Sequence, residues 1–323
     1  MCSEQSNIIR DYRGNVISME EIQWVCRHHR IGEITRIHGV LAYGTNVPIL
    51  VETEKGKYVL RYLTQTVPKG RINFIEDILI CLKGASVPVV NAIKNESGDY
   101  YSFIHNRMIQ VYPYIEGSRF KFDPEQIKSN ARMLNKFHTT LNSYKQGPLP
   151  GESNCPTEEN LKKRLNRLYQ KKESISKSSL SKIKSLYSTI IELWKKADKN
   201  NLLETIIHDD WHPWNLIYSE DGSVSCILDF DLVRPGKRIY DVAYCIYWIY
   251  KQSPNNKSQT YSKMFIEGYE GLTPEEKNIL PLVIAKVGLF FIIEFVSRID
   301  KQLKVNEPLI EFFLSQEGKE FLL

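Results

Sequence analysis

The residues best suited to metal and phosphate chemistry are concentrated in one stretch of the chain, His208–Asp231. It reads His-Asp-Asp-Trp-His-Pro-Trp-Asn-Leu-Ile-Tyr, then a short polar turn, then Cys-Ile-Leu-Asp-Phe-Asp. Two histidines, five aspartates and one asparagine are set around two apolar runs, Thr205–Ile207 and Val224–Leu228. Because oxygen ligands at the ends of strand-like runs can hold a cation against phosphate groups, this stretch predicts a metal-phosphate site.

Three residues of this stretch are spaced to act together. Asp210 and Asn215 are five apart with Pro213 between them, which places them on a rigid loop and not on one helix face. Asp229 ends the second apolar run, and a turn at Ser219–Gly222 would return it toward the loop as in a hairpin. Phosphoryl transfer needs a carboxylate to accept a hydroxyl proton and oxygen ligands to hold magnesium. The three residues supply a base, a neutral ligand and an anionic ligand.

The length and composition are those of an ordinary globular protein. The chain has 323 residues, of which 42% are apolar and 25% charged, so two domains or lobes are expected. A net charge of +5 is compatible with an anionic ligand such as ATP, but it is too mild to indicate nucleic acid. Six cysteines occur without any Cys-x-x-Cys pair, which favours a reducing cytoplasm over a zinc site or a disulfide framework.

Targeting and membrane segments are not evident in the sequence. The first residues lack a basic region followed by an apolar core, so we expect no signal peptide. The most apolar segment, Ile279–Val296, contains Lys286 and Glu294 and is slightly short for a membrane span. We therefore expect a buried helix there, no membrane partner and a cytoplasmic protein.

Residues 1–115 predict a small lobe rich in strands. Ser18 is a candidate N-cap for a helix at Met19–His28. Period-2 runs bounded by turns predict an antiparallel sheet of five or six strands with one helix packed on it. The strands are expected at Glu33–Ala42, Val47–Glu54, Tyr58–Leu63, Val87–Lys94, Tyr101–Ile104 and Met108–Tyr114, and the helix at Arg71–Leu82.

Residues 116–323 predict a larger, mainly helical lobe that follows a hinge near Tyr112–Gly117. The fold class is therefore α+β, with a mixed first lobe and a helical second lobe. Apolar residues at helical spacing give the expected helices. These are Pro124–Leu141, Glu158–Gln170, Ser179–Lys199, Tyr240–Lys251, Ser258–Glu270, Thr273–Ile299 with a break or kink at Pro281, and Glu307–Phe321.

The motifs of the central stretch resemble those of the aminoglycoside phosphotransferase and choline kinase-like family, which are small-molecule relatives of the protein kinases. The resemblance lies in His208-Asp-Asp210-x4-Asn215 followed by Ile-Leu-Asp229. It extends to Tyr240-Asp241-Val-Ala, which is similar to the family's Asp-(Leu/Val)-Ala signature. With the order of the lobes it covers about residues 30–300. The resemblance implies a protein-kinase-like bilobal fold.

The resemblance also implies a role for each matching position. Asp210 would be the catalytic base, and Asn215 and Asp229 would be magnesium ligands. His208 would brace the loop, and Asp241 would hydrogen-bond its backbone.

Other residues of the stretch are less defined by the resemblance. Asp231 would neighbour the metal site, and we favour a loop hydrogen bond over ligand contact for His212. Trp211 and Trp214 are expected to pack. Asp209 departs from the pattern, because the aminoglycoside branch usually has glycine there. Its carboxylate is expected to alter either the loop geometry or the charge preference for the acceptor.

Two charged residues of the small lobe match the family's phosphate-binding pair. Arg61, in Tyr-Val-Leu-Arg, stands where the family has its phosphate-gripping lysine, and arginine still offers a cation with several donors. Glu76, on the following helix, is its expected ion-pair partner. The alternative for each residue alone is an ordinary surface charge.

Backbone groups complete the predicted nucleotide site. The turn holding Gly44, Thr45 and Asn46 resembles the family's nucleotide loop, whose N–H groups would cap the β- and γ-phosphates. Adenine needs one C=O and one N–H two residues apart, which Tyr112 C=O and Tyr114 N–H would supply. An ordinary hairpin turn and an ordinary edge strand are the alternatives.

The predicted function is ATP- and magnesium-dependent phosphorylation of a hydroxyl group on a small molecule. The nucleotide preference between ATP and GTP stays open, as does the acceptor among aminoglycosides, homoserine, choline or ethanolamine, and sugars. Glu158–Lys199 and the C-terminal helices are expected to select the acceptor. The alternative is a catalytically idle, spore-coat-like or regulatory scaffold, which would be expected to lack Asp210, Asn215 or Asp229; all three are present. A monomer or homodimer is expected.

Overall fold

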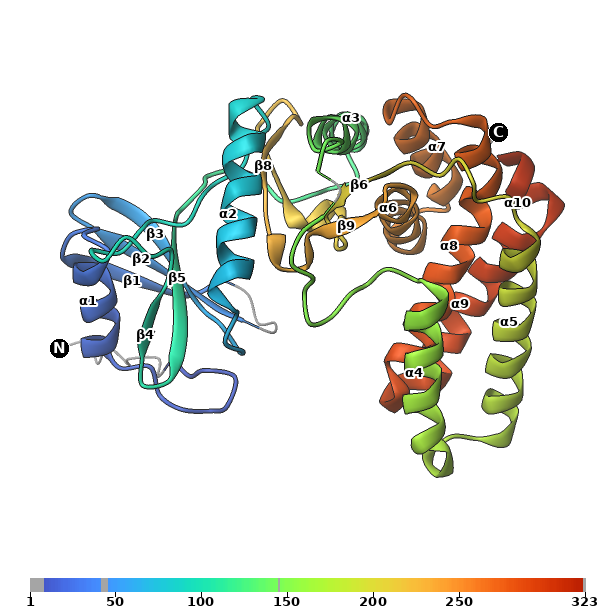
Figure 1. Cartoon of the computed structure of the whole chain (residues 1–323), viewed down its shortest axis with the longest axis horizontal. Helices are drawn as coiled ribbons and strands as arrows, with labels where there is room; N and C mark the ends of the chain where they lie inside the picture. Colours follow the sequence, from blue (N-terminus) through green and yellow to red (C-terminus); the bar gives the residue numbers. More distant parts are fainter. Residues whose placement is uncertain (1–8, 42–45, 145, 322–323) are drawn as a thin grey trace. The chain divides into compact units, whose positions relative to one another are not determined.

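The computed structural model describes residues 9–41, 46–144 and 146–321, and it divides into two compact units. The first unit contains the described residues up to Gly84 and then Val89–Glu116. The second contains Ala85–Pro88 and the described residues from Gly117 onward. Figure 1 shows that strands dominate the first unit and helices the second.

The first unit is built on an antiparallel sheet with strand order β1-β2-β3-β5-β4. Its apolar core joins strand residues such as Ile49 and Leu60 to Ile22 and Val25 of the first helix. The predicted N-cap is confirmed, because the Ser18 side chain accepts from the Glu21 N–H. The elements are α1 (Met19–His28), β1 (Ile34–Val40), β2 (Val47–Thr53), β3 (Gly56–Tyr62), α2 (Lys69–Gly84), β4 (Ser102–Ile104) and β5 (Arg107–Pro113).

The strand predicted at Val87–Lys94 is wrong, and the sheet has five strands. The backbone of this segment is hydrogen-bonded elsewhere. The Ala92 N–H donates to the Glu76 carboxylate at 3.3 Å, whereas the Ile93 N–H donates to Val111 C=O at 2.7 Å. The buried Glu76 side chain therefore accepts from a backbone N–H that a strand would donate to its neighbour, and no strand ladder forms at this position.

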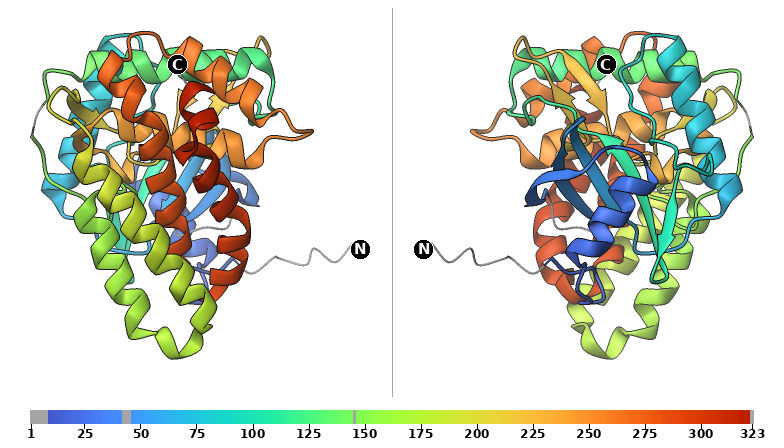
Figure 2. Two further views of the ribbon diagram at one scale, coloured as in Figure 1. Left: turned by 90° about the vertical axis from the view of Figure 1, so that its right-hand side faces the viewer. Right: turned by 90° about the vertical axis from the view of Figure 1, so that its left-hand side faces the viewer.

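The second unit is mainly helical, with two short two-stranded sheets that carry the stretch of interest. β6 pairs with β9, and β7 pairs with β8. Figure 2 shows α4 and α5 joined as a long helical hairpin. The strands are β6 (Glu204–Ile207), β7 (Leu216–Tyr218), β8 (Val224–Ile227) and β9 (Arg234–Lys237). The helices are α3 (Pro124–Thr140), α4 (Glu158–Gln170), α5 (Lys177–Lys196), α6 (Ile239–Gln252), α7 (Ser258–Gly268), α8 (Pro274–Glu294), α9 (Ile299–Leu314) and α10 (Gln316–Phe321).

The predicted helix break at Pro281 is wrong, because α8 continues through it. Leu280 and Val283, on either side of this proline, are completely buried, and their packing outweighs the missing backbone hydrogen bond. The chain breaks instead at Phe295, after which α9 begins earlier than predicted and includes Pro308. The last predicted helix is divided between α9 and α10.

Among the helices in the described ranges, none is by itself long and apolar enough to cross a membrane. The pair Pro274–Glu294 and Val296–Leu314 meets the length and composition criteria together, with a bend of 94° between its members. The first member is the buried helix that the sequence predicted, and its residues from Ile279 to Ile293 are mostly in the core.

Candidate active site

The predicted hairpin brings Asp229 back to the loop that holds Asp210. β6 leads into this loop, and a short 3-10 turn at Pro213–Asn215 leads out of it into β7. β7 and β8 pair antiparallel, and the Leu228 N–H donates to Asn215 C=O at 2.8 Å. The residue before Asp229 is therefore fixed to the end of the loop. We call residues 208–215 the catalytic loop.

The Asp210 carboxylate is held by three side-chain donors. Its Oδ1 accepts from Asn154 Nδ2 at 3.0 Å and from the Tyr244 hydroxyl at 2.8 Å. Its Oδ2 accepts from Asn215 Nδ2 at 3.1 Å, and His212 Nε2 lies 3.8 Å from the same oxygen. The side chain is still 21% exposed. Since a carboxylate oxygen has two lone pairs, Oδ1 is filled, whereas Oδ2 accepts one hydrogen bond from the residues described.

The environment of Asp210 favours a group that can exchange a proton near neutral pH. Burial raises the pKa of Asp210 to about 7, and the negative charge of Asp229 adds to this effect. The hydrogen bonds from Tyr244, Asn215 and Asn154 act in the opposite direction. A raised pKa in a partly accessible carboxylate is typical of a general base.

Asp241, at the start of α6, holds the backbone of the catalytic loop as predicted. Its Oδ2 accepts from the His208 N–H at 2.7 Å, and its Oδ1 accepts from the Asp209 N–H at 2.9 Å. His138 Nε2 lies 3.0 Å from Oδ2, and the other nitrogen of this ring lies 2.7 Å from the Tyr269 hydroxyl. These groups are almost fully buried, so the hydrogen bonds form away from water.

His208 ties the loop to the strand that precedes Asp229. Its Nε2 donates to Leu228 C=O at 2.9 Å, and its ring is completely buried. Burial lowers the pKa of His208. The bracing role predicted from the sequence matches this contact.

The residues present fit a magnesium ion. The Asn215 amide nitrogen is engaged with Asp210 Oδ2 and with Asp210 C=O at 3.0 Å, which leaves the amide oxygen as the ligand atom. Asp229 has left-handed backbone angles, φ 62° and ψ 65°, which are uncommon for residues other than glycine. The repulsion between Asp210 and Asp229 is of the kind that a divalent cation offsets. Within the described residues no group of three or more His, Cys, Asp or Glu side chains could hold a metal. The Asn215–Asp229 pair is the candidate that the sequence predicted.

Aromatic rings pack around His212, whose Nε2 is the ring atom 3.8 Å from Asp210 Oδ2. His212 packs near Trp214, Tyr244 and Trp248, with ring centroids 5.8 to 6.4 Å apart. Burial lowers the pKa of His212 to about 4, so this ring is neutral. The loop hydrogen bond favoured for the His212 ring stays a prediction, because its buried Nδ1 has no hydrogen-bond partner among the described residues. The His212 backbone C=O accepts from the Asn215 N–H at 2.9 Å. Trp211 packs as predicted and donates to Asn130 at 2.7 Å.

Asp209 is the residue of the catalytic loop that departs from the family pattern. Its φ of +64° lies in the left-handed region, where glycine is favoured. Its carboxylate is 4% exposed and accepts from the Ser153 hydroxyl at 2.6 Å. Burial raises the pKa of Asp209 to about 7. The carboxylate is thus buried against Ser153, and both effects expected from the sequence, on loop geometry and on acceptor charge preference, stay predictions.

The predicted nucleotide residues lie on the first unit. Arg61 is on β3, opposite Pro48 and Gln110 on the neighbouring strands. Glu76 is fully buried on α2 and accepts from Asn91 Nδ2 at 2.9 Å as well as from Ala92. An Arg61–Glu76 ion pair stays a prediction.

The predicted phosphate loop is described only at its end. Asn46 precedes β2, and its side-chain oxygen accepts from the Thr64 N–H at 3.1 Å. Gly44 and Thr45 lie outside the described residues.

The predicted adenine pair, Tyr112 C=O with Tyr114 N–H, is wrong. The Tyr114 N–H donates to Lys57 C=O at 2.9 Å, and Tyr112 is paired with Val59. Because backbone groups of alternate residues point to the same side of a strand, Tyr112 and Tyr114 both face β3. By the same alternation Pro113 C=O, one residue out of phase with the prediction, points to the opposite edge of β5.

The sequence analysis missed three residues that position the site. Asn154 comes from an irregular loop and gave no motif. Tyr244 follows Asp241 by three residues on α6, so helical spacing could have placed both toward the catalytic loop. His138 is on α3, more than a hundred residues from its partner Asp241.

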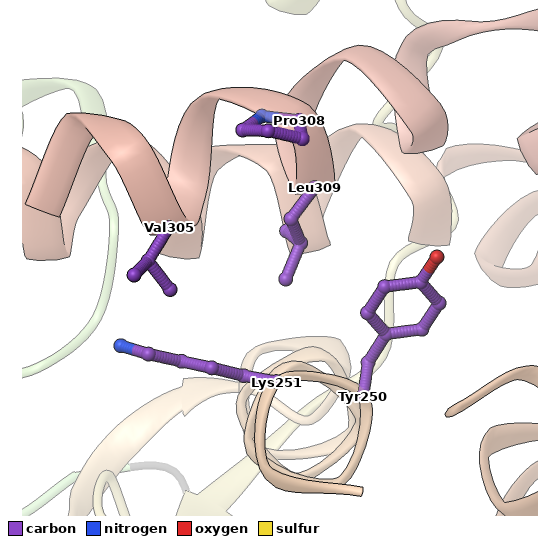
Figure 3. A pocket seen from close by; sticks show the side chains of 5 residues that line it. All are labelled: Tyr250, Lys251, Val305, Pro308 and Leu309. Carbon is purple, nitrogen blue, oxygen red and sulfur yellow. The ribbon is translucent and has the colours of Figure 1, made fainter. Parts of the chain in front are cut away.

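A separate hollow between α6 and α9 does not belong to this site. It has a volume of about 210 Å³ and is lined by Tyr250, Lys251, Val305, Pro308 and Leu309. Figure 3 shows Val305 and Leu309 directed from α9 toward the α6 side chains. Its lining includes no residue of the catalytic loop.

Comparisons with known proteins agree with this geometry. The model of the phosphotransferase enzyme family matches residues 45–276, which is more than half of the chain. A homoserine kinase from Caulobacter vibrioides (strain NA1000 / CB15N) is 22% identical over 289 residues, covering 88% of this chain and 87% of the relative.

Two solved structures share the fold. A microcompartment-associated aminopropanol kinase has a TM-score of 0.72 at 14% identity and covers 95% of this chain and 99% of its own. An amicoumacin kinase, solved with AMP-PNP, Ca2+ and Ami, has a TM-score of 0.70 at 15% identity, covering 92% and 96%.

The chain belongs to the phosphotransferase enzyme family. It is a small-molecule phosphotransferase with a protein-kinase-like α+β fold. The family, the fold class and the enzyme class predicted from the sequence are thereby confirmed.

The Asp241 contacts predict a large loss of stability in Asp241→Asn. Asparagine keeps the size but offers one acceptor oxygen and an NH2 group that meets a backbone N–H, so at least one buried donor is left unsatisfied. We expect the free energy of unfolding, measured by urea titration, to fall by about 1–3 kcal/mol. Asp221→Asn is the matched control, because Asp221 also accepts from Ser219 and Ser223 but in an exposed turn. Equal stability of the two variants would contradict the role of Asp241.

Proposed function

We propose that this protein transfers the γ-phosphoryl group of ATP, with magnesium, to the hydroxyl group of a small amino alcohol of the homoserine type. The observation that carries the proposal is the Asp210 carboxylate. Three donors fix it, it keeps one open lone pair on Oδ2, and it lies close enough to Asp229 for their charges to interact. The homoserine kinases and the aminopropanol kinase among the similar proteins support this acceptor class.

Asp210 acts as the general base in this proposal. Oδ2 of Asp210 accepts the proton of the acceptor hydroxyl. At the same time the hydroxyl oxygen forms a bond to the γ-phosphorus of ATP. The bond between this phosphorus and the β–γ bridging oxygen breaks, and ADP leaves with the electron pair. The Asn154 and Tyr244 hydrogen bonds to Oδ1 direct the other oxygen toward the acceptor.

Asn215 and Asp229 are the proposed magnesium ligands. When bound, the ion would neutralise the negative charge of the phosphate oxygens. Asn215 Nδ2 is held by Asp210, so its amide oxygen is oriented before any ion arrives. Leu228 and His208 hold the backbone beside Asp229 in the same way.

Residues of the first unit are proposed to bind the nucleotide. The Arg61 guanidinium would pair with phosphate oxygens, and Glu76 would orient it. Backbone N–H groups of the turn ending at Asn46 would contact the β- and γ-phosphates. Pro113 C=O and Ile115 N–H replace the earlier pair as the proposed partners of adenine, because Pro113 C=O points to the edge of β5 away from β3 and Ile115 lies two residues further along the chain.

The surroundings of Asp210 Oδ2 support an acceptor with an ammonium group. His212 Nε2 lies 3.8 Å from this oxygen, and the rings of Trp214 and Trp248 pack against His212. An ammonium ion is attracted to the faces of aromatic rings, most strongly to tryptophan. An amino alcohol could thus place its hydroxyl at Asp210 and its ammonium group against these rings.

The acceptor class is tested by a coupled assay of ADP release with ATP and magnesium. The panel contains homoserine, ethanolamine, choline, 1-amino-2-propanol, sugars and aminoglycosides. We expect acceptor-dependent turnover with at least one of the amino alcohols and little with the sugars. Turnover confined to aminoglycosides or sugars would overturn the acceptor class, and silence across the panel with ATP bound would favour the idle scaffold.

The base assignment predicts that Asp210→Asn lowers kcat by roughly 10²–10⁴, because asparagine cannot accept the hydroxyl proton. ATP binding, measured by calorimetry, should persist. Glu220→Gln, on the exposed turn after β7, is the control and should keep full turnover. Near-normal kcat in Asp210→Asn would reject Asp210 as the base.

The metal assignment predicts that Asp229→Asn weakens the magnesium-dependent part of nucleotide binding by about tenfold or more. Asparagine tolerates the left-handed backbone at this position, so the fold should be retained. Calorimetric titrations with ATP, run with magnesium and with EDTA, give the comparison. An undiminished effect of magnesium in the variant would show that Asp229 is not a ligand.

A further inference from the structure

We propose that Asp209 is a positioning residue: it fastens the segment Ser153–Cys155 to the catalytic loop and so holds Asn154 on Asp210. This inference rests on the proposed role of Asp210 as the base. It assigns a purpose to the residue that departs from the family pattern, and it links the loop to a segment more than fifty residues away.

The carboxylates of two consecutive residues, Asp209 and Asp210, accept hydrogen bonds from the side chains of two other consecutive residues. The Ser153 hydroxyl donates to Asp209 Oδ2 at 2.6 Å, and Asn154 Nδ2 donates to Asp210 Oδ1 at 3.0 Å. The Ser153 oxygen also accepts from the Cys155 N–H at 3.1 Å, which shapes the turn around Asn154. Since neighbouring residues move together, fixing Ser153 to Asp209 limits where the Asn154 amide can lie.

The segment is held on its other side by α4. Ser153 C=O accepts from Asn160 Nδ2 and from Arg164 at 2.9 Å each, and Cys155 C=O accepts from Asn160 at 2.8 Å. Arg164 is 4% exposed, and Asn160 Oδ1 accepts from its Nε at 3.2 Å. Asp209 therefore joins the catalytic loop to an ordered anchor.

The backbone at Asp209 would suit glycine better than aspartate. With φ at +64°, glycine would adopt this conformation with less strain than aspartate. The Asp209 N–H is bound by Asp241, and glycine would keep that hydrogen bond. What aspartate adds is its contact with Ser153, together with a buried carboxyl group.

The consequence for Asp210 is a fixed carboxylate plane. Rotation about the last bond of an aspartate side chain is broad, so one hydrogen bond would orient it poorly. Asn154 and Tyr244 on Oδ1, with Asn215 on Oδ2, define the plane and leave the open lone pair of Oδ2 in one direction. Without Asn154, Oδ1 keeps only the Tyr244 hydrogen bond and Oδ2 only that of Asn215, so we expect the carboxylate to rotate more freely and to meet the acceptor proton less often.

The test compares Asp209→Gly with Asp209→Asn. Glycine relieves the backbone but removes the acceptor, whereas asparagine keeps an oxygen for Ser153 and tolerates the same φ. Kinetics use ATP, magnesium and homoserine, replaced by the most active panel compound if homoserine is not phosphorylated. We expect kcat to fall on the order of 10–100-fold in Asp209→Gly, with KM for ATP little changed, and to recover to within about threefold of wild type in Asp209→Asn.

Further variants separate positioning from folding. Ser153→Ala breaks the same contact from the other side and should reproduce the loss of kcat even if Asp209→Gly does not fold. Ser223→Ala is the control, because Ser223 also donates to an aspartate, Asp221, at 3.1 Å but in an exposed turn, and it should keep full turnover. In Asp209→Gly combined with Asn154→Ala, the loss should be about that of the larger single change, because both act through one contact.

Each contrary result has a distinct meaning. Wild-type kcat in both Asp209→Gly and Ser153→Ala, with Asp210→Asn inactive, would overturn the positioning role and leave the base assignment intact. Equal losses of kcat in Asp209→Gly and Asp209→Asn would also overturn the positioning role. The negative charge of Asp209, and not its hydrogen bond with Ser153, would then be what matters. An active Asp210→Asn would instead reject the proposed function.

Discussion

The catalytic loop depends on one buried carboxylate, that of Asp241. It accepts from the N–H groups of two consecutive loop residues and is in turn bound by His138. A loop that leaves a strand has backbone donors with no ladder partner, and burying them unpaired is costly. Asp241 satisfies two of them at once from the first turn of α6. The position of every functional group on the loop follows from this anchoring.

Around that anchor, the site is a convergence of segments that are far apart in the chain. α3 contributes His138, the segment before α4 contributes Asn154, and α6 contributes Tyr244. Each makes at least one hydrogen bond that a small shift would break. Because side chains in close-packed interiors have few alternative positions, such a network gives Asp210 a single orientation. The orientation of the Asp210 carboxylate therefore depends on residues from several helices and loops of the second unit.

Predictions from local patterns were most successful where one element decides the outcome. The Ser18 cap, the amphipathic helices and the hairpin that returns Asp229 all follow from residue types at short spacing. They were wrong where a competing partner lies elsewhere. Glu76 takes a backbone donor from the predicted strand at Val87–Lys94, and the pairing of β5 with β3 sets which edge Tyr114 faces.

The sequence by itself determined the family, the fold class and the set of chemical groups, because the spacing of Asp210, Asn215 and Asp229 is a property of the chain. Tertiary structure alone decided what those groups contact. It placed Asn154 and Tyr244 on one oxygen of Asp210 and buried the Asp209 carboxylate against Ser153. Hydrogen bonds between distant segments depend on how helices and loops pack, and no short pattern records that packing. In the sequence Asp209 is only a departure from the family pattern. Its contact with Ser153 is seen only in the tertiary structure.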